Sequence, residues 1–316
     1  MKILGKTKAF QESFFNLQRM PVYMPASLET RWFLTDTEKN FNKNQHITSY
    51  GADDVFYKFN RQGFRSIEFE HDSDAINVLI VGESNSIGVG LPYDEVWFNI
   101  LGQKLKEHED IPNIKFFNMS VSSITLDQMS IMINQVYDVL KPDYTVIIGT
   151  SFFASSYYKS ETDKSTDFLH FSLTAQFDNP EGKLIPDITF IPPELHGISD
   201  SFTKDLNLAN CFFKSLSAYS FIKRVCGENF LIYFRNPKVY NIDLENEIKK
   251  YDSDFSDRFL NFPIPILSPS TCSQSELARD CIHVGKNSHI KIADFVLNKL
   301  RNNGTLEKWK MKFSSN

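Results

Sequence analysis

The sequence predicts an α/β protein, built as a three-layer α/β/α sandwich around a five-stranded parallel sheet. Short apolar runs typical of buried strands alternate with longer segments whose apolar residues recur at helical spacing. This strand-helix-strand order implies right-handed crossovers between parallel strands. The chain of 316 residues is 41% hydrophobic, which supports a substantial core and argues against disorder.

The first half of the regular region contains the clearest elements. Residues 76–81 (I-N-V-L-I-V) are typical of a buried strand, and residues 94–106 carry apolar side chains on one helical face. Residues 114–118 predict a second strand. Residues 125–140 predict a second helix, with Thr125 as its N-cap and a Lys-Pro-Asp stop directly after it.

The second half resumes this alternation after an interruption. We expect strands at residues 144–148, 230–234 and 264–267, and helices at residues 204–225, 244–251 and 288–300. The interruption, at about residues 151–200, contains a turn sequence at 178–182 that suggests a hairpin. It is too short for much core of its own, so we interpret it as an insertion beside the edge of the sheet that holds the site.

The predicted domain organisation has three parts. An N-terminal extension at residues 1–70 wraps the core, and the α/β domain with its insertion covers residues 71–303. Residues 304–316 form a C-terminal tail, whose basic residues we expect to be solvated.

Composition argues against several classes of function. A formal charge of -5 does not fit a general nucleic-acid binder, because phosphate contacts need clustered Lys and Arg. No segment approaches the ~20 apolar residues of a membrane helix, and the first residues become charged before a signal-peptide core forms. We therefore expect a cytoplasmic protein without a membrane partner.

Cofactors and metals are not expected either. The 4 cysteines form no C-x-x-C pair, so the sequence indicates neither a zinc site nor a disulfide framework. No carboxylate stands at the spacing of metal ligands from His46, His71, His108, His170 or His196. His289, on the last predicted helix, is interpreted as structural.

Two short motifs carry the candidate chemistry. Gly-Glu-Ser-Asn at residues 82–85 follows the first predicted strand, and Asp-Cys-Ile-His at residues 280–283 precedes the last helix. A serine hydroxyl is a poor nucleophile unless a base removes its proton, and His283 is the candidate base for Ser84. Asp280 can accept from the other ring nitrogen of that histidine. Ser, Asp, His in chain order is one of several orders that produce a nucleophilic triad.

With these motifs the chain resembles the SGNH, or GDSL, hydrolase family over about residues 60–300. Five segments carry the resemblance: residues 60–65 (N-R-Q-G-F-R), 78–90, 118–121 (N-M-S-V), 143–149 and 280–300. The resemblance implies a flavodoxin-like sheet and a serine esterase that uses Ser84, His283 and Asp280. It suggests small O-acyl substrates, with O-acetyl groups on a glycan among the candidates. Cys281 stands where the family has a small residue, which favours a space-filling thiol over a nucleophile.

The resemblance also implies three donors for the oxyanion that develops during acyl transfer. They are the backbone N–H of Ser84, the backbone N–H of Ser123 where the family has glycine, and the side chain of Ser151 where the family has asparagine. A backbone N–H is present whatever the side chain, but a serine hydroxyl is shorter than an amide and rotates freely. We therefore expect the third donor to be weakened or replaced. Glu83, where the family has aspartate, is a smaller change.

Three functions fit these residues. The leading hypothesis is hydrolysis of a small-molecule or glycan ester without a cofactor. An O-acyltransferase could use the same triad with a sugar hydroxyl as acceptor, and the sequence does not separate the two. A non-catalytic SGNH-like binding protein would explain the missing glycine and asparagine, but it has no reason to keep Ser84, Asp280 and His283. The sequence specifies neither the acyl group nor the oligomeric state.

Overall fold

A five-stranded parallel sheet forms the centre of the computed structural model, which describes residues 27–122, 124–151, 155–158, 168–175, 184–187, 201–235, 238–239, 242–261 and 276–314. Its strands are β3 (Ile76–Gly82), β4 (Ile114–Asn118), β5 (Tyr144–Ser151), β9 (Phe230–Arg235) and β12 (Phe259–Leu260). They lie in the order β12-β9-β5-β3-β4, and every neighbouring pair is parallel. This is the flavodoxin-like order, so the predicted fold class is confirmed.

Both faces of the sheet are buried, which explains why its strands read as continuous apolar runs. In β3, Val78 and Ile80 belong to the core on one face, whereas Leu79 and Val81 belong to the core on the other. Successive side chains of a strand point to opposite faces, so a strand covered on both sides needs apolar residues at almost every position.

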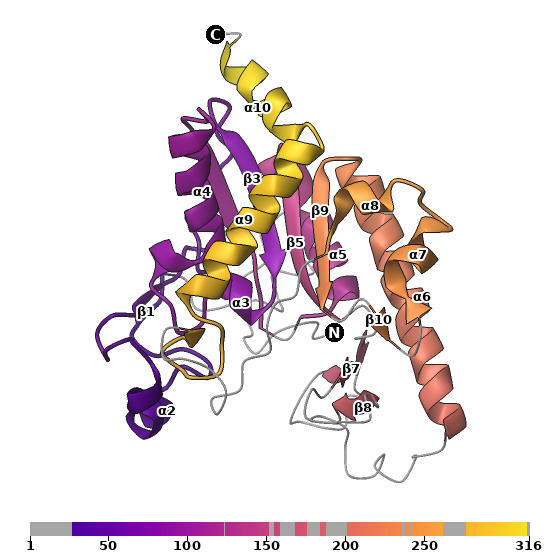
Figure 1. The fold of residues 1–316 in the computed structure, drawn as a ribbon, viewed down its shortest axis with the longest axis horizontal. Helices are drawn as coiled ribbons and strands as arrows, with labels where there is room; N and C mark the ends of the chain where they lie inside the picture. Colours follow the sequence, from indigo (N-terminus) through magenta and orange to yellow (C-terminus); the bar gives the residue numbers. More distant parts are fainter. Residues whose placement is uncertain are drawn as a thin grey trace.

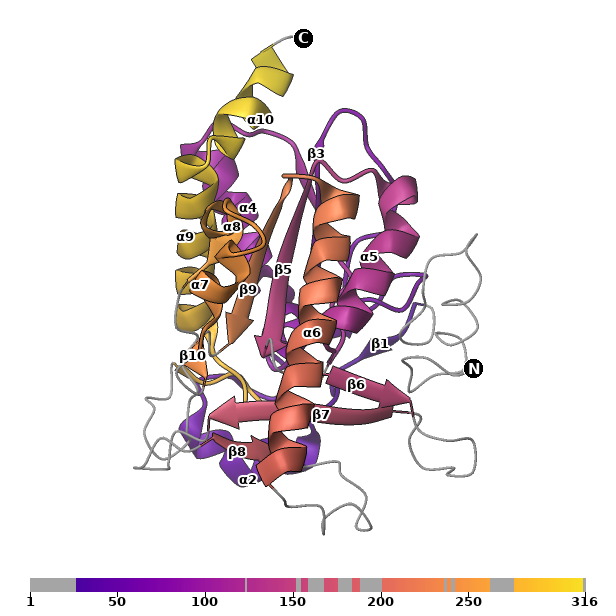
Figure 2. The same ribbon diagram turned by 90° about the vertical axis from the view of Figure 1, so that its right-hand side faces the viewer.

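Helices cover the two faces of the sheet (Figure 1, Figure 2). On one face lie α4 (Trp97–His108), α9 (Lys286–Asn302) and α10 (Thr305–Ser314), and on the other lie α5 (Leu126–Leu140) and α6 (Ser201–Cys226). The short helices α7 (Leu244–Lys249) and α8 (Phe255–Arg258) precede β12. Thr125 caps α5 as predicted, in a reciprocal capping box with Gln128. The predicted first helix begins later than expected, because residues Tyr93–Glu95 form a separate 3-10 turn.

The fifth strand of the described sheet is β12, at the edge next to β9. The fifth strand expected at residues 264–267 lies outside the described residues. In the described part of the chain, the edge of the sheet is β12, directly after α8.

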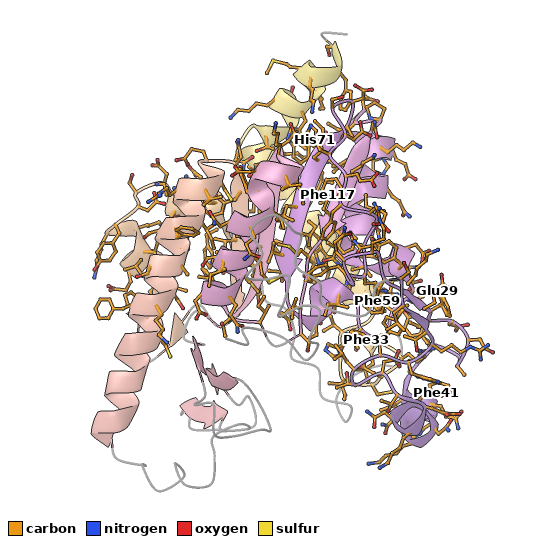
Figure 3. All side chains as sticks on the ribbon, turned by 180° about the vertical axis from the view of Figure 1, so that it is seen from behind. Glu29, Phe33, Phe41, Phe59, His71 and Phe117 are labelled. Carbon is orange, nitrogen blue, oxygen red and sulfur yellow. The ribbon has the colours of Figure 1, made fainter. Side chains whose placement is uncertain are left out.

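The N-terminal extension shares the core of the main domain wherever it is described, from residue 27 onward. Its short strands β1 (Glu29–Thr30) and β2 (Tyr57–Lys58) pair with each other, and α2 (Glu38–Asn44) and a 3-10 turn (Gln45–Ile47) lie between them. Phe33 and Phe59 pack with their ring centroids 4.9 Å apart and join the same core as Phe117 of β4 (Figure 3). The extension therefore contributes interior surface and not only a covering layer.

The interruption at about residues 151–200 contains a small antiparallel sheet of β6 (Ser155–Tyr158), β7 (Phe168–Ala175) and β8 (Leu184–Asp187). The pairing of β7 with β8 is the predicted hairpin, and the turn between them lies outside the described residues. Figure 2 shows this sheet beyond the carboxyl end of β5. A second hairpin, of β10 (Lys238–Val239) and β11 (Ile242–Asp243), follows β9.

The C-terminal segment is a helix that packs on the core and not a tail, although its lysines at 308, 310 and 312 stay exposed or half-exposed, as predicted. Leu306 and Trp309 are buried, and the Trp309 ring meets Tyr144 edge-on at 5.7 Å. Lys312 donates to the carbonyl of Ala75 at 2.8 Å and pairs with Asp143. The apolar residues of this segment recur every three or four positions and form a narrow helical face among the lysines.

Candidate active site

Ser84 lies at the carboxyl end of β3, as the first residue of the short helix α3 (Ser84–Ile87). Gly82 makes this turn possible, because a Cβ on it would come within 2.7 Å of the Ser86 Cβ. The Ser84 hydroxyl donates to Glu83 Oε2 at 2.9 Å, and the Asn85 amide donates to the other oxygen of the same carboxylate. The sequence therefore places the predicted nucleophile at the edge of the sheet where parallel α/β folds build their sites.

Asp280 and His283 form the predicted pair within a tight turn, which we call the base loop (residues 277–284). His283 Nδ1 lies 2.6 Å from Asp280 Oδ2, and Asp280 Oδ1 accepts from the backbone N–H of His283 at 3.0 Å. Asp280 is fully buried, and the His283 side chain is 13% exposed. Because Nδ1 faces Asp280, the opposite ring nitrogen, Nε2, is directed away from the carboxylate and can serve as the base.

The carboxylate of Asp280 is kept ionised by its partners. Burial alone would raise its pKa, but hydrogen bonds and the attraction of His283, together with a hydrogen bond from Thr35, hold the pKa below the ordinary value. An ionised Asp280 would stabilise an imidazolium at His283.

Cys281 is a packing residue of the base loop. It is buried, and its φ of 59° lies in the left-handed region that favours glycine. Burial, followed by the charges of Asp280 and Asp36, raises the pKa of its thiol to about 11. The thiol is therefore protonated at neutral pH and is not a competing nucleophile.

The base loop packs against the segment that carries the nucleophile, which we call the serine loop (residues 83–91). The carbonyl of Gly90 accepts from the backbone N–H of Arg279 at 2.8 Å. A Cβ on Gly90 would lie 2.9 Å from the Cβ of Ala278, and its φ of 77° is left-handed. Glycine at this position lets the two loops touch.

Arg65, from the N-x-x-G-F-R lead-in, fixes the path of the serine loop. Its buried guanidinium donates to the carbonyls of Gly88 at 2.6 Å and Leu91 at 2.8 Å, and lies 4.4 Å from the centroid of the Tyr57 ring. Burial lowers the pKa of Arg65 to about 10, so the group still carries its charge at neutral pH. The lead-in motif was the sequence signal for this contact, although the sequence did not show what it holds.

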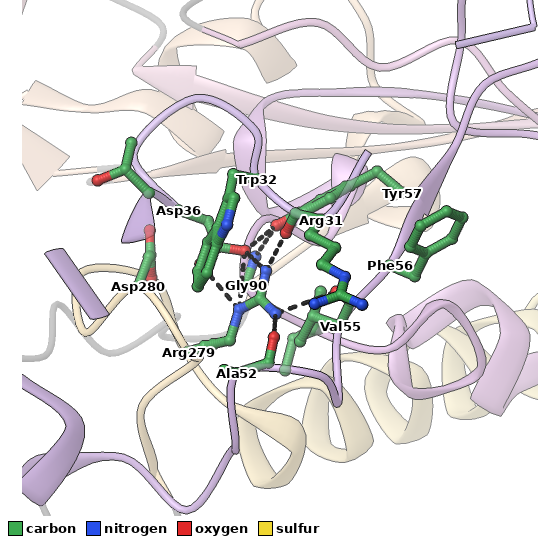
Figure 4. A network of polar contacts seen from close by, with 12 residues as sticks. Arg31, Trp32, Asp36, Ala52, Val55, Phe56, Tyr57, Gly90, Arg279 and Asp280 are labelled. Atoms are coloured by element: carbon green, nitrogen blue, oxygen red, sulfur yellow. Dashed lines mark hydrogen bonds and ion pairs between the residues drawn. The ribbon is translucent and has the colours of Figure 1, made fainter. Parts of the chain in front are cut away.

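A second buried arginine, Arg279, ties the base loop to the N-terminal extension (Figure 4). Its guanidinium pairs with Asp36 at 2.7 Å and donates to the carbonyl of Val55 at 3.0 Å. The Tyr57 hydroxyl donates to Asp36 Oδ2 at 2.6 Å and accepts from the backbone N–H of Gly90 at 2.7 Å. We call these three residues, Asp36, Tyr57 and Arg279, the Asp36–Arg279 network. The network joins the base loop to the serine loop. The sequence analysis did not identify any of them, since their only signal was an arginine directly before Asp280.

His289 has a structural contact. It is buried on α9, and its Nδ1 accepts from the backbone N–H of Trp97 at 3.0 Å. Burial, followed by the charges of His283 and Arg65, lowers its pKa to about 3, so the ring stays neutral at all physiological pH values.

The predicted oxyanion donors are only partly placed. Ser84 lies at the site, and Ser123 lies outside the described residues. Ser151 ends β5, opposite Arg235 of β9, after an irregularity in the pairing. The carboxyl ends of β3 and β5 are neighbours, because Gly82 pairs with Ile148. The backbone therefore brings Ser151 to the correct edge of the sheet, and its role as a donor stays a prediction.

The described part of the chain shows neither a metal-binding cluster nor a membrane-spanning helix. It contains no group of three or more His, Cys, Asp or Glu side chains that could hold a metal ion. Among the described helices, none combines the length and apolar character needed to cross a membrane.

No family model and no curated protein matches the chain. Several solved structures are similar to it, and they include GDSL-family esterases and lipases. The psychrotrophic esterase EstA of Pseudoalteromonas has 12% identity and a TM-score of 0.38, covering 72% of this chain and 97% of its own. A putative lipolytic protein of the G-D-S-L family from Desulfitobacterium hafniense has 11% identity and a TM-score of 0.35, covering 71% and 99%. A carbohydrate esterase of Clostridium thermocellum has 12% identity and a TM-score of 0.35, covering 74% and 98%. At such low scores, the function proposed below rests on the geometry of the site.

Proposed function

We propose that this protein is a serine esterase that hydrolyses an O-acyl ester through Ser84, His283 and Asp280. The observation that carries the proposal is the buried Asp280 carboxylate 2.6 Å from His283 Nδ1, in a loop that packs directly on the serine loop. A structural histidine would not need an ionised, fully buried partner at the carboxyl edge of a parallel sheet.

The reaction follows from these positions. The Ser84 hydroxyl turns from Glu83 toward His283, whose Nε2 accepts the proton as Oγ attacks the ester carbonyl. The tetrahedral intermediate expels the alcohol, which takes the proton from His283, and an acyl-enzyme remains. Water then attacks the acyl carbon as His283 accepts its proton. The second tetrahedral intermediate expels the Ser84 oxygen, which takes this proton from His283, and the acid is released. Asp280 stabilises the imidazolium in both steps.

The substrate class is proposed from the resemblance of the N-x-x-G-F-R lead-in. It suggests short acyl groups, with O-acetyl groups on a glycan as the first natural candidates. An O-acyltransferase remains the alternative, because a sugar hydroxyl could replace water in the second step. Product analysis with and without a sugar acceptor separates the two reactions.

A fluorophosphonate probe gives the direct test of the proposal. We expect the probe to label one residue, Ser84, because phosphonylation needs the same activated hydroxyl as acylation. Mass spectrometry of the labelled peptide identifies the site. The absence of labelling, in a protein whose unfolding is cooperative, would favour a non-catalytic binding protein.

The pH profile of kcat/KM should have a single acid limb, which we assign to His283. If neutral His283 is the base, kcat/KM should rise with pH through an apparent pKa of about 6–7, since the imidazolium below that pH cannot accept a proton. Asp280, with its lowered pKa, and His289, at about 3, should add no further limb there. The measurement is kcat/KM for a short-chain nitrophenyl ester from about pH 5 to 8, in which the His283→Ala variant should lose both activity and limb. A flat profile in an active enzyme would assign the base to another group.

Ser151 offers a test of the third oxyanion donor. We expect weak wild-type activity on generic esters, an increase in Ser151→Asn and a decrease in Ser151→Ala. One well-placed donor contributes about 10²–10³ in kcat, which sets the upper limit of the gain. If both variants keep the kcat of the wild type, Ser151 only ends a strand and the third donor lies elsewhere.

A further inference from the structure

The Asp280 carboxylate has a partner that lies far from it in sequence. Thr35 Oγ1 donates to Asp280 Oδ2 at 2.7 Å, although the two residues are 245 positions apart. This is the same oxygen that lies 2.6 Å from His283 Nδ1. The other oxygen, Oδ1, accepts backbone N–H groups of the base loop. Two groups therefore share Oδ2, the candidate base and a hydroxyl from the N-terminal extension.

The Thr35 hydroxyl is held in place by the turn around it. Phe33 and Asp36 form a closed backbone pair, with hydrogen bonds of 2.8 and 3.0 Å, so that Thr35 lies within a tight turn. The Asn40 amide donates to the Thr35 carbonyl at 2.7 Å. Asp36, the next residue, pairs with Arg279, the residue before Asp280. The turn and the base loop are thus also joined by the residues next to the Thr35–Asp280 contact.

We propose that Thr35 is a positioning residue of the active site, which orients Asp280 and limits how strongly this carboxylate raises the basicity of His283. The inference rests on the proposed function in assigning His283 as the base. A hydrogen bond to a carboxylate stabilises its negative charge, and the charge then attracts the imidazolium less strongly. Without the Thr35 hydroxyl, Oδ2 would have only His283 as a donor among the described residues, and the protonated ring would be more stable.

Other charged groups near this pair do not obscure the effect. They are Asp36 and Arg279, which pair with each other, Cys281 in the base loop, His289 on α9, Glu83 in the serine loop and Arg65, which contacts that loop. The pKa of Cys281 is raised to about 11 and that of His289 is lowered to about 3, so both titrate far from His283. All six groups are present in every variant below, so differences between variants report the Thr35 hydroxyl.

The test is an NMR titration of the His283 ring, assigned with the His283→Ala variant. Thr35→Val removes the hydroxyl at nearly constant volume, and Thr35→Ala removes it without a branched side chain. Thr35→Ser keeps it. We expect the pKa of His283 to rise by about 0.5–1 unit in Thr35→Val and Thr35→Ala and to stay at the wild-type value in Thr35→Ser. Thr37→Ala is the matched control, because Thr37 caps α2 in the same segment and Asp280 is not its partner. It should lower the melting temperature without moving the titration.

A pKa of His283 that is unchanged or lower in both Thr35→Val and Thr35→Ala would overturn the proposal. The same shift in Thr37→Ala would also overturn it, because the effect would then come from loosening of the segment. The titration needs no turnover, so its result is distinguishable from a failure of the proposed function, which would appear as a wild-type protein that neither hydrolyses esters nor takes the fluorophosphonate probe. In an active enzyme, the acid limb of kcat/KM should move upward together with the titration.

Discussion

Ser84→Ala should abolish ester hydrolysis and leave the protein folded. Alanine removes the only atom that forms the acyl bond, and the loss in subtilisin-type enzymes is on the order of 10⁶ in kcat. The stability cost should be small, because the Ser84 hydroxyl makes one described hydrogen bond, to Glu83, and such a bond contributes about 1 kcal/mol net. The measurements are kcat/KM on a short-chain nitrophenyl ester and a thermal melt.

Ser86→Ala is the matched control for this experiment. Ser86 lies in the same short helix and is fully buried, and its hydroxyl accepts from Trp97 Nε1 at 3.2 Å. Its loss should lower the free energy of unfolding by about 1 kcal/mol and leave a measurable esterase. If Ser84→Ala keeps wild-type activity, the triad assignment is wrong, whatever the control shows.

The sheet could be predicted from the sequence because burial on both faces leaves a local signal. β3 and β4 read as continuous apolar runs, and their predicted positions are confirmed within one residue. Thr125 likewise predicts the start of α5, because its capping partner, Gln128, is only three residues away. The edge strand β12 is short, and its two residues do not stand out from the helix before them. Elements whose contacts are local in sequence can therefore be predicted from the sequence. A short edge strand cannot, because it is defined by pairing with a strand that is distant in sequence.

The contacts of the candidate site also divide into those that are local in sequence and those that join distant segments. Asp280 and His283 are three residues apart, so their pairing within one turn was predictable. Thr35 and Arg65 act on the site from segments that are distant in sequence. Hydrogen bonds between distant segments leave no periodicity in either segment. The N-terminal extension was therefore predicted as a covering layer, although it supplies partners for the base loop and the serine loop.

Arg279→Met should produce the largest loss of stability among these variants. The Arg279 side chain is fully buried, as is that of its partner Asp36. Methionine fills much of the space but leaves the Asp36 carboxylate buried without its charge partner, and it removes donors from the carbonyls of Ala52 and Val55. Breaking a buried ion pair in this way costs about 3–5 kcal/mol. The melting temperature should therefore fall by roughly 6–20 °C, at 2–4 °C per kcal/mol. Activity should fall as well, because the base loop loses one of its attachments to the extension and keeps the Thr35–Asp280 contact.

Two variants show whether this loss comes from the buried charge. Arg31→Met removes an arginine of the same network region that pairs with Asp53 in solvent, with 64% and 76% of the two side chains exposed. It should change stability by no more than about 0.5 kcal/mol. In the double variant Asp36→Asn with Arg279→Met, the stranded carboxylate is gone, so part of the stability should return and the two losses should not add. If Arg279→Met costs no more than Arg31→Met, the Asp36–Arg279 network does not hold the base loop. If the double variant shows simple additivity, the loss in Arg279→Met comes from the missing carbonyl donors and the altered packing, because a buried unpaired charge would be relieved by Asp36→Asn.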